Sequence, residues 1–163
     1  MDEKGIIEIK YQQVRKEDET LIKMIADWYF SEWNIPAETT IQRLSTFSTD
    51  GIPFQSMMSI NNVPVATGGV YDHVGLLDRE PRFKIYTPWL ALVYTKIEYR
   101  NQGYGALLCN YIEHVSRESG LKELFLFTHT AETLYKRLGW RQLERIILNE
   151  KEIVIMKKEL QHH

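Results

Sequence analysis

The stretch with the clearest chemical potential is residues 100–105, which read Arg-Asn-Gln-Gly-Tyr-Gly. Glycine has no side chain to hold a ligand away from the backbone. The first N–H groups of a helix have no partner within that helix, and the helix dipole favours an anion beside them. Arg100 adds a fixed positive charge that suits phosphate. The pattern predicts phosphate binding, and a plain strand-to-helix turn is the alternative.

The elements around this loop would present it to a ligand. Residues 89–95 are strand formers, and residues 106–118 repeat apolar side chains at helical spacing until Gly120 ends the helix. The glycine spacing matches neither the G-x-x-x-x-G-K-[ST] loop of nucleotide triphosphatases nor the G-x-G-x-x-G turn of dinucleotide-binding folds. The pattern is R-x-x-G-x-G between a strand and a helix.

Apolar periodicity and turn residues divide the rest of the chain into further elements. Strands are expected at residues 6–14, 54–60, 63–71, 85–95, 124–128, 143–148 and 153–156. Helices are expected at residues 17–33, 36–47, 106–118 and 130–138, with Leu107 among the inward residues of the third and Thr130 capping the last. Residues 72–83 are predicted to be a polar loop. The order β-α-α-β-β-β-α-β-α-β-β predicts an α/β fold, a mixed sheet with helices on its faces.

Composition narrows the function classes. At 163 residues with a formal charge of −2, the chain fits one domain at residues 1–160 and gives no reason to expect nucleic acid or a membrane as partner. Cys109 is the single cysteine, so neither a disulfide framework nor a cysteine metal cluster is expected, and no metal is predicted. The cytoplasm is the expected location. His162 and His163, in the tail 161–163, are native or the remnant of a tag.

Several segments resemble one known family. The R-x-x-G-x-G loop resembles the acetyl-CoA loop of the GCN5-related N-acetyltransferases, whose pattern is Q/R-x-x-G-x-G/A. Residues 124–140, LFLFTHTAETLYKRLGW, look like that family's strand-helix segment ending in Y-x-x-x-G-F/W. Residues 87–94, TPWLALVY, and residues 26–33, ADWYFSEW, are similar to a subgroup of bacterial members. The resemblance implies the acyl-CoA N-acyltransferase fold, with strands 85–95 and 124–128 splayed apart and acetyl-CoA in the gap.

The resemblance also implies a reaction and a set of binding groups. It implies transfer of an acetyl group from acetyl-CoA to a primary amine of a small molecule or peptide, through a ternary complex. Backbone groups of Leu92, Val93 and Thr95 would hold the pantetheine arm, and one N–H would polarise the thioester carbonyl. The pyrophosphate would lie against the loop, whose contributing residues are Arg100, Gln102, Gly103, Tyr104 and Gly105.

Two residues are candidates for proton transfer. The family pattern implies that Tyr135 protonates the departing thiolate, whereas its helical spacing with apolar neighbours also fits a core residue. His129 is either a base or a histidine that only hydrogen-bonds the backbone. The strand at 89–95 departs from many family members because it carries no carboxylate. Weaker candidates, each explained as well by a solvated or packing role, are Asp72, His73, Glu98, Cys109 and His114.

The acceptor side and the partners stay open. Trp28, Tyr29 and Trp33 lie on the helix that borders the acceptor in this family, and they fit a core stripe as well as a pocket wall. Asp27 and Glu32 either attract a cationic amine or form a solvated face. Two other functions remain: an acyl-CoA-binding regulatory module without catalysis, and an acetyltransferase of protein N-termini or lysines. The oligomeric state is expected to be monomer or homodimer.

Overall fold

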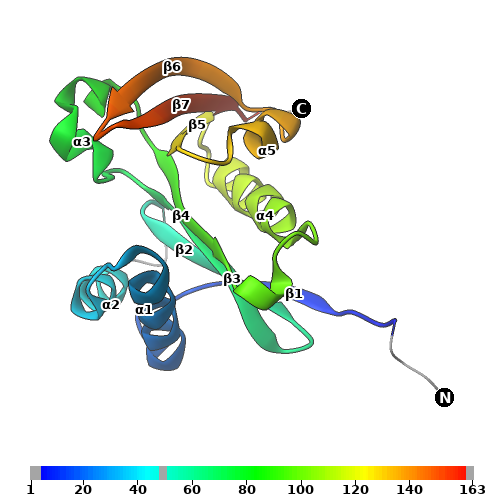
Figure 1. Ribbon diagram of the computed structural model, residues 1–163. Coiled ribbons are helices and arrows are strands. Elements are labelled where there is room, and N and C mark those ends of the chain that lie inside the picture. Colours follow the sequence, from blue (N-terminus) through cyan, green and yellow to red (C-terminus); the bar gives the residue numbers. More distant parts are fainter. Residues whose placement is uncertain (1–4, 48–50, 161–163) are drawn as a thin grey trace. The chain divides into compact units, whose positions relative to one another are not determined.

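The computed structural model describes residues 5–47 and 51–160, and the tail predicted at 161–163 lies outside them. The predicted strands and helices are all present in the predicted order, and the structure adds one α-helix, α3 (Leu76–Arg79), between the third and fourth strands (Figure 1). The strands are β1 (Ile9–Gln13), β2 (Phe54–Ile60), β3 (Val63–Tyr71), β4 (Trp89–Thr95), β5 (Glu123–Thr128), β6 (Arg141–Leu148) and β7 (Lys151–Glu159). The α-helices are α1 (Glu19–Trp33), α2 (Ala37–Ser45), α3 (Leu76–Arg79), α4 (Tyr104–Glu118) and α5 (Glu132–Arg137). Two 3-10 helices are η1 (Pro81–Ile85) and η2 (Ile97–Tyr99).

The strands form the predicted mixed sheet. Hydrogen bonds link them in the order β1-β2-β3-β4-β5-β7-β6. β1 and β2 are antiparallel, as are β5 and β7 and also β6 and β7, whereas β4 and β5 pair in parallel at Trp89 and Phe125. By backbone contacts the chain has two compact units, Met1–Gly69 with Leu92–Ile112 and Val70–Ala91 with Glu113–His163. The expectation of a single domain stays a prediction.

The first unit contains β1, α1, α2, β2, most of β3, the second part of β4, η2 and the first part of α4. α1 and α2 lie side by side (Figure 1), because each has an apolar stripe that must be covered. Ile22, Ile25 and Tyr29 of α1 are buried, and so are Met57 and Met58 of β2. The C-terminal end of α1 is closed by Asn34 in the left-handed conformation, with φ 58°, which asparagine tolerates.

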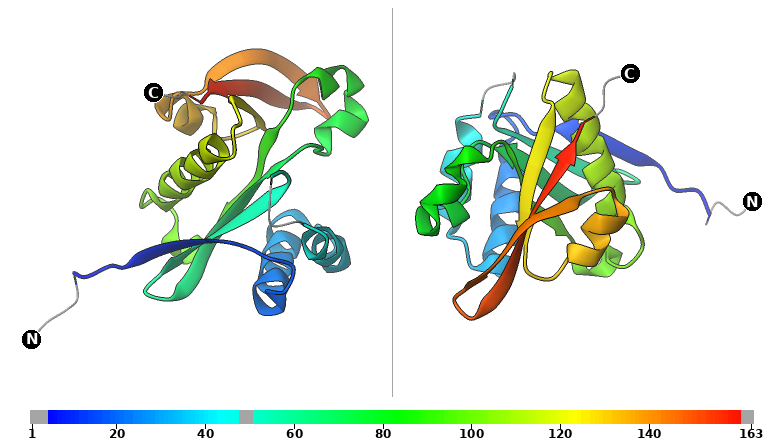
Figure 2. Two further views of the ribbon diagram at one scale, coloured as in Figure 1. Left: turned by 180° about the vertical axis from the view of Figure 1, so that it is seen from behind. Right: turned by 90° about the horizontal axis from the view of Figure 1, so that it is seen from above.

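The second unit contains the end of β3, α3, η1, the first part of β4, the second part of α4, β5, α5, β6 and β7. Figure 2 shows β6 and β7 running side by side as a long hairpin. Phe125 of β5 lies at the centre of an aromatic cluster, with its ring centroid 4.9 Å from that of Tyr86 and 6.0 Å from that of Trp89. Trp89 is fully buried, and its indole N–H donates to the Tyr86 carbonyl. The cluster fixes the start of β4 beside β5.

Several sequence predictions were wrong in detail. Residues 72–83 are not a polar loop, because they form α3 and enter η1, and Leu76, Leu77 and Phe83 of that segment are buried. The central strand begins at Trp89 rather than at residue 85, since Pro88 has no N–H to donate to a sheet. Thr130 does not cap α5, whose N-cap is Ala131. The hydroxyl of Thr128 accepts from the Ala131 N–H instead.

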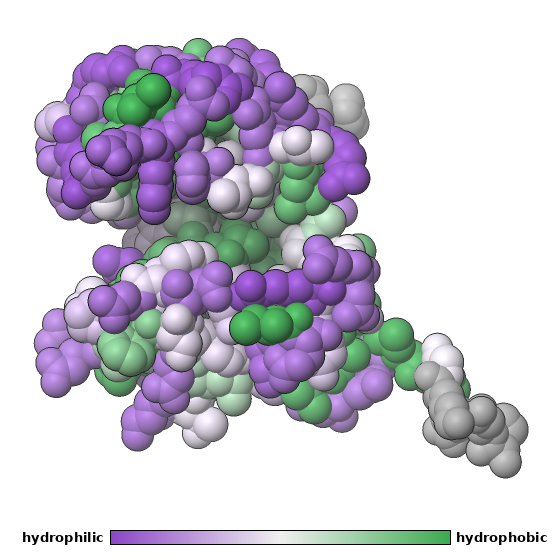
Figure 3. Space-filling model, viewed as in Figure 1, coloured by the Kyte–Doolittle hydropathy of each residue, from purple (hydrophilic) through white to green (hydrophobic). Residues whose placement is uncertain are grey.

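The surface is mainly polar on the face drawn in Figure 3, where hydrophobic residues form smaller areas among hydrophilic ones. Ile85, Ile97 and Ile147 are the most exposed of the large hydrophobic residues, and Leu107, expected to face inward, is 40% exposed. Within residues 5–47 and 51–160, none of the helices has the length and apolar character that crossing a bilayer requires.

Candidate functional site

The glycine loop folds as the sequence predicts, between a strand and a helix. β4 ends at Thr95, the short helix η2 follows, and α4 starts at Tyr104 and runs for 15 residues. Gly103 has φ +87°, a left-handed backbone conformation that residues with a Cβ rarely adopt. Its carbonyl accepts a hydrogen bond from the Leu107 N–H at 3.2 Å, and this bond marks the start of the helix. The N–H groups of the first turn of α4 are therefore available to an anion at this end.

Arg100 is held by its own surroundings. Its Nε donates to the Thr95 carbonyl at 2.6 Å, and its Nη2 lies 3.0 Å from a carboxylate oxygen of Glu32 on α1. Its guanidinium carbon is 5.3 Å from the centroid of the Tyr94 ring. The positive charge predicted for phosphate is thus paired with a carboxylate, and the side chain joins the loop to β4 and α1. The role of Arg100 toward phosphate stays a prediction.

The strand before the loop contains a strongly kinked residue. Leu92 has φ 58°, a left-handed conformation that costs a non-glycine residue about 1–3 kcal/mol and that occurs most often at functional sites. Its carbonyl oxygen accepts a hydrogen bond from the Tyr29 hydroxyl at 2.6 Å. The kink lies among the backbone groups for which the family resemblance implies binding of the pantetheine arm, Leu92, Val93 and Thr95. Nothing in the local sequence indicates it.

A buried chain of hydrogen bonds leads to this kink. The Gln55 side-chain nitrogen donates to the Tyr29 hydroxyl at 2.9 Å and to the Thr67 hydroxyl at 2.8 Å. The Thr67 hydroxyl donates to the Ser56 carbonyl at 2.7 Å. Gln55 and Thr67 are fully buried, and Tyr29 is 1% exposed. Neither Gln55 nor Thr67 is among the residues predicted from the sequence, although a glutamine in a strand that also contains Phe54, Met57 and Met58 is a signal that it needs buried partners.

The aromatic residues of α1 pack against β4. The Trp28 ring lies 5.3 Å from that of Tyr94, and the Trp33 ring lies 6.2 Å from it. Tyr29 contacts Trp33 at 5.3 Å. Trp33 is nevertheless 42% exposed, and Asp27 is exposed. The stripe is therefore part core and part surface, and its role as a pocket wall for an acceptor stays a prediction.

Tyr135 lies in the second unit, on α5. It is 9% exposed, and its ring meets the Trp140 ring edge-on at 6.0 Å. Its carbonyl accepts from the Trp140 N–H at 3.0 Å, which turns the chain sharply after Gly139, where φ is +97°. The Y-x-x-x-G-W pattern thus has a packing explanation in the contact of its two aromatic residues. The catalytic role of Tyr135 stays a prediction.

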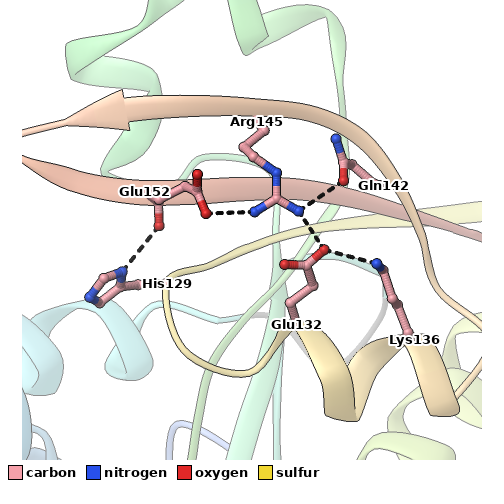
Figure 4. Close-up of polar contacts among 6 residues, drawn as sticks. All are labelled: His129, Glu132, Lys136, Gln142, Arg145 and Glu152. Carbon is pink, nitrogen blue, oxygen red and sulfur yellow. Dashed lines mark hydrogen bonds and ion pairs between the residues drawn. The ribbon is translucent and has the colours of Figure 1, made fainter.

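His129 directly follows β5 and is exposed. Its Nδ1 lies 3.1 Å from the Glu152 carbonyl oxygen (Figure 4). Because a carbonyl can only accept, Nδ1 carries the proton when this bond forms, and Nε2 is then the acceptor of the neutral ring. The structure thus contains the backbone hydrogen bond of the simpler interpretation, in a tautomer that a base also requires.

Beside His129, Arg145 of β6 binds two carboxylates (Figure 4). Its Nη1 lies 2.7 Å from Glu152 of β7, and its Nη2 lies 2.6 Å from Glu132 of α5. Lys136 is 3.1 Å from the same Glu132 oxygen. Hydrogen bonds from Arg145 and then from Lys136 lower the pKa of Glu132 below its ordinary value. This cluster ties α5, the helix of Tyr135, to the β6–β7 hairpin.

The weaker candidates have ordinary surroundings. His73 is exposed and pairs with Asp78, its Nε2 3.1 Å from a carboxylate oxygen. Asp72, Glu98 and His114 are exposed, and Cys109 is buried. The part of the chain that the structure describes contains no group of three or more histidine, cysteine, aspartate or glutamate side chains placed to hold a metal ion.

Comparisons with known proteins agree with this architecture. The fold is similar to that of an aminoglycoside 6'-N-acetyltransferase complexed with coenzyme A, with TM-score 0.73 and 13% identity over 94% of this chain and 98% of that one. A GNAT-family acetyltransferase from Streptococcus pneumoniae has a TM-score of 0.70 and 15% identity, over 94% of this chain and 100% of that one. The ribosomal-protein-S18-alanine N-acetyltransferase from Escherichia coli has a TM-score of 0.67 and 13% identity, over 96% of each chain. At these identities the likeness shows the fold alone.

The sequence itself supplies the family. No curated protein sequence is significantly similar to the chain. Residues 61–142, just over half of the chain, match the sequence profile described as the acetyltransferase (GNAT) domain. This segment runs from β3 through the kinked strand and the glycine loop to the turn after Tyr135. The chain therefore belongs to the GCN5-related N-acetyltransferase family.

Proposed function

We propose that the protein transfers an acetyl group from acetyl-CoA to a primary amine of a small molecule or a peptide, within a ternary complex. One observation carries the proposal. The R-x-x-G-x-G loop, with Gly103 at φ +87°, leads into the first turn of the 15-residue helix α4, inside the segment that matches the family profile. Such a turn offers several N–H groups to which the pyrophosphate of a coenzyme could bind.

The residues present fit the donor as follows. The N–H groups of residues 102–105 would bind the pyrophosphate, and no side chain projects from Gly103 or Gly105 to block it. Nothing lies within 4 Å of the position that a Cβ on Gly103 would take. Because Arg100 is already paired with Glu32, backbone groups would supply most of the attraction for the phosphates. The backbone of Leu92, Val93 and Thr95 would hold the pantetheine arm.

Acetyl-CoA, when bound, supplies an activated thioester. In the reaction the neutral amine attacks the carbonyl carbon, the C–S bond breaks, and the amine proton leaves with a base. A β4 N–H would stabilise the negative charge that develops on the carbonyl oxygen. We propose Tyr135 as the acid that gives its proton to the thiolate, and His129, through Nε2, as a candidate base. β4 has no carboxylate that could act as the base.

The acceptor is the least constrained part of the proposal. The structural neighbours include enzymes named for an aminoglycoside and for a ribosomal-protein alanine, so both small molecules and peptides belong in the substrate panel. Trp33 and Asp27, both exposed on α1, would suit an acceptor that combines apolar surface with positive charge. A module that binds acyl-CoA without catalysis is the second candidate, favoured by the missing carboxylate on β4.

The test compares two glycine variants. Gly103 and Gly51 are both exposed, have φ of +87° and +71°, and have no atoms within 4 Å of the position that a Cβ would take. Valine at either site therefore carries a similar backbone cost of about 1–3 kcal/mol, but only Gly103→Val disturbs the loop. Acetyl-CoA at 100 times its Kd should raise the Tm of the wild type and of Gly51→Val by about 5–10 °C, and should not raise that of Gly103→Val.

Thiol release with a panel of amines then separates the candidate functions. Turnover with any amine by the wild type supports the acetyltransferase. A thermal shift without turnover supports the binding module. An unchanged Tm at saturating acetyl-CoA would contradict both.

A further inference from the structure

Tyr29 combines two properties that a core aromatic residue does not need together. It is 1% exposed, and its hydroxyl both donates and accepts a hydrogen bond inside the first unit. The bond it donates, at 2.6 Å, goes to the carbonyl of Leu92, the left-handed residue of β4. A buried hydroxyl is thus directed at the one residue of β4 that has a left-handed backbone conformation.

The direction of the Tyr29 proton is fixed by its neighbours. The amide nitrogen of Gln55 can only donate, and its two N–H groups go to the hydroxyls of Tyr29 and Thr67. The Tyr29 oxygen therefore accepts from Gln55, and its own proton goes to the Leu92 carbonyl. Thr67 passes its proton to the Ser56 carbonyl in the same way. Each donor in this buried chain has a partner, so the chain is a rigid support rather than a loose contact.

Holding one carbonyl fixes a whole peptide group. The peptide between Leu92 and Val93 is trans and planar, so its C=O and its N–H point to opposite sides. With the Leu92 oxygen bound to Tyr29, the Val93 N–H must point away from Tyr29. Val93 is held from another side as well, because a Cβ on Gly68 would lie 3.1 Å from Val93 Cγ2 and 3.4 Å from Val93 Cα. β3 thus approaches this peptide closely, and a larger residue at position 68 would require Val93 to shift.

We propose that Tyr29 is a positioning residue of the acetyl-transfer site. By holding the Leu92 carbonyl it fixes the direction of the Val93 N–H, which polarises the thioester carbonyl of the bound donor. This inference rests on the proposed function. It adds to that function the identity of the polarising N–H, that of Val93, and of the side chain that orients this N–H, Tyr29. Tyr29 touches neither substrate, and it acts through the peptide that it holds.

The main test is Tyr29→Phe, which keeps the ring and removes the hydroxyl. A misdirected N–H lowers the rate of the chemical step, so kcat should fall by about tenfold or more. CoA has no thioester carbonyl, so its Kd should stay within about twofold of the wild-type value. Any preference of the wild type for acetyl-CoA over CoA should be lost. A general loss of structure would weaken both ligands alike, which separates positioning from stability.

A second readout needs no activity. The ¹H–¹⁵N signal of the Val93 amide in the ligand-free protein should move in Tyr29→Phe. Tyr111→Phe is the matched control, because Tyr111 is a half-buried tyrosine of the same unit whose hydroxyl accepts a hydrogen bond from Gln13 at 3.1 Å. This control should leave kcat, the ligand preference and the Val93 signal essentially unchanged. Gln55→Leu keeps the Tyr29 hydroxyl but frees its proton to turn, and it should show a smaller change in the same direction.

The outcomes are distinguishable. If the wild type is active and Tyr29→Phe matches it in kcat and in the ratio of the two affinities, the inference is overturned and the proposed function stands. If the wild type binds both ligands but acetylates no amine, the proposed function fails, and the affinity ratio and the Val93 signal still decide the role of Tyr29. If Tyr29→Phe does not fold, Gln55→Leu decides by the same measurements. A wild type that binds neither acetyl-CoA nor CoA overturns both.

Discussion

The second unit contains a buried ion pair whose loss should be costly. Glu113 of α4 is 2% exposed, and its Oε1 lies 2.7 Å from Nζ of Lys158 on β7. Its other oxygen, Oε2, has no hydrogen-bond partner among the described residues. Lys158 also donates to the Leu138 carbonyl at the end of α5. One lysine thus joins a helix, a strand and the end of the Tyr135 helix.

The change is Lys158→Met, which keeps the length of the side chain and leaves the Glu113 carboxylate buried without its main cation. Breaking such a pair costs about 3–5 kcal/mol of unfolding free energy. Arg117 remains 3.9 Å from the same oxygen, and Lys158 is 21% exposed, so the lower end applies. We expect a loss of about 3 kcal/mol, which lowers the urea midpoint by about 1.5 M for a slope of about 2 kcal/mol/M.

Urea unfolding at neutral pH, followed by fluorescence, measures this loss. Lys157→Met is the matched control, because the neighbouring lysine is 20% exposed and pairs at 3.0 Å with Glu123, which is 40% exposed. That more exposed pair should contribute at most about 1 kcal/mol. The double variant Glu113→Leu/Lys158→Met removes both charges and should recover to within about 1 kcal/mol of the wild type. A loss below about 1 kcal/mol for Lys158→Met, or a double variant as unstable as the sum of the single ones, would refute the reasoning.

Two further predictions concern proton transfer. Tyr135→Phe keeps the contact with Trp140 and should leave the Tm and the Kd of acetyl-CoA nearly unchanged while turnover falls by about 10²-fold, as expected for loss of a positioned acid. Steady-state rates with one working amine measure it, and equal turnover would remove Tyr135 from the mechanism. His129→Ala should lower the rate most near neutral pH and less at high pH, where the amine is already neutral. A pH–rate profile identical to that of the wild type would leave His129 only its bond to the Glu152 carbonyl.

The elements that the sequence predicts well are those specified locally. The change from strand to helical period around residues 100–105, with glycine at the left-handed position, fixes the loop and the start of α4 within two residues. β2 and β3 are predicted with their observed ends, because turn residues bound them on both sides. The prediction for segment 72–83 is wrong because its charged residues outnumber its apolar ones, yet the apolar residues Val74, Leu76, Leu77 and Phe83 are all buried and decide its fold.

The site is harder to predict because its geometry depends on distant contacts. Leucine disfavours a left-handed conformation, so no local rule places one at Leu92. The contacts that meet this stretch come from far away in the chain: the hydrogen bond from Tyr29, 63 positions earlier, and the close approach of Gly68 to Val93. Arg100 illustrates the same limit. Its charge suggests a phosphate ligand, but Glu32, 68 positions away, determines what that charge faces.

These two contacts come from one face of α1. Tyr29 and Glu32 are three positions apart, so they lie together on the helix surface, one directed at the kink in β4 and the other at the glycine loop. The same face carries Trp33, which packs against Tyr94 and remains partly exposed. In the proposed reaction, α1 would therefore support both stretches of backbone that bind the donor, while its exposed aromatic surface is left for the acceptor. A substitution at Tyr29 or Glu32 intended to change acceptor choice would then also alter the donor site, so acceptor specificity is best probed at the exposed side chains of Trp33 and Asp27.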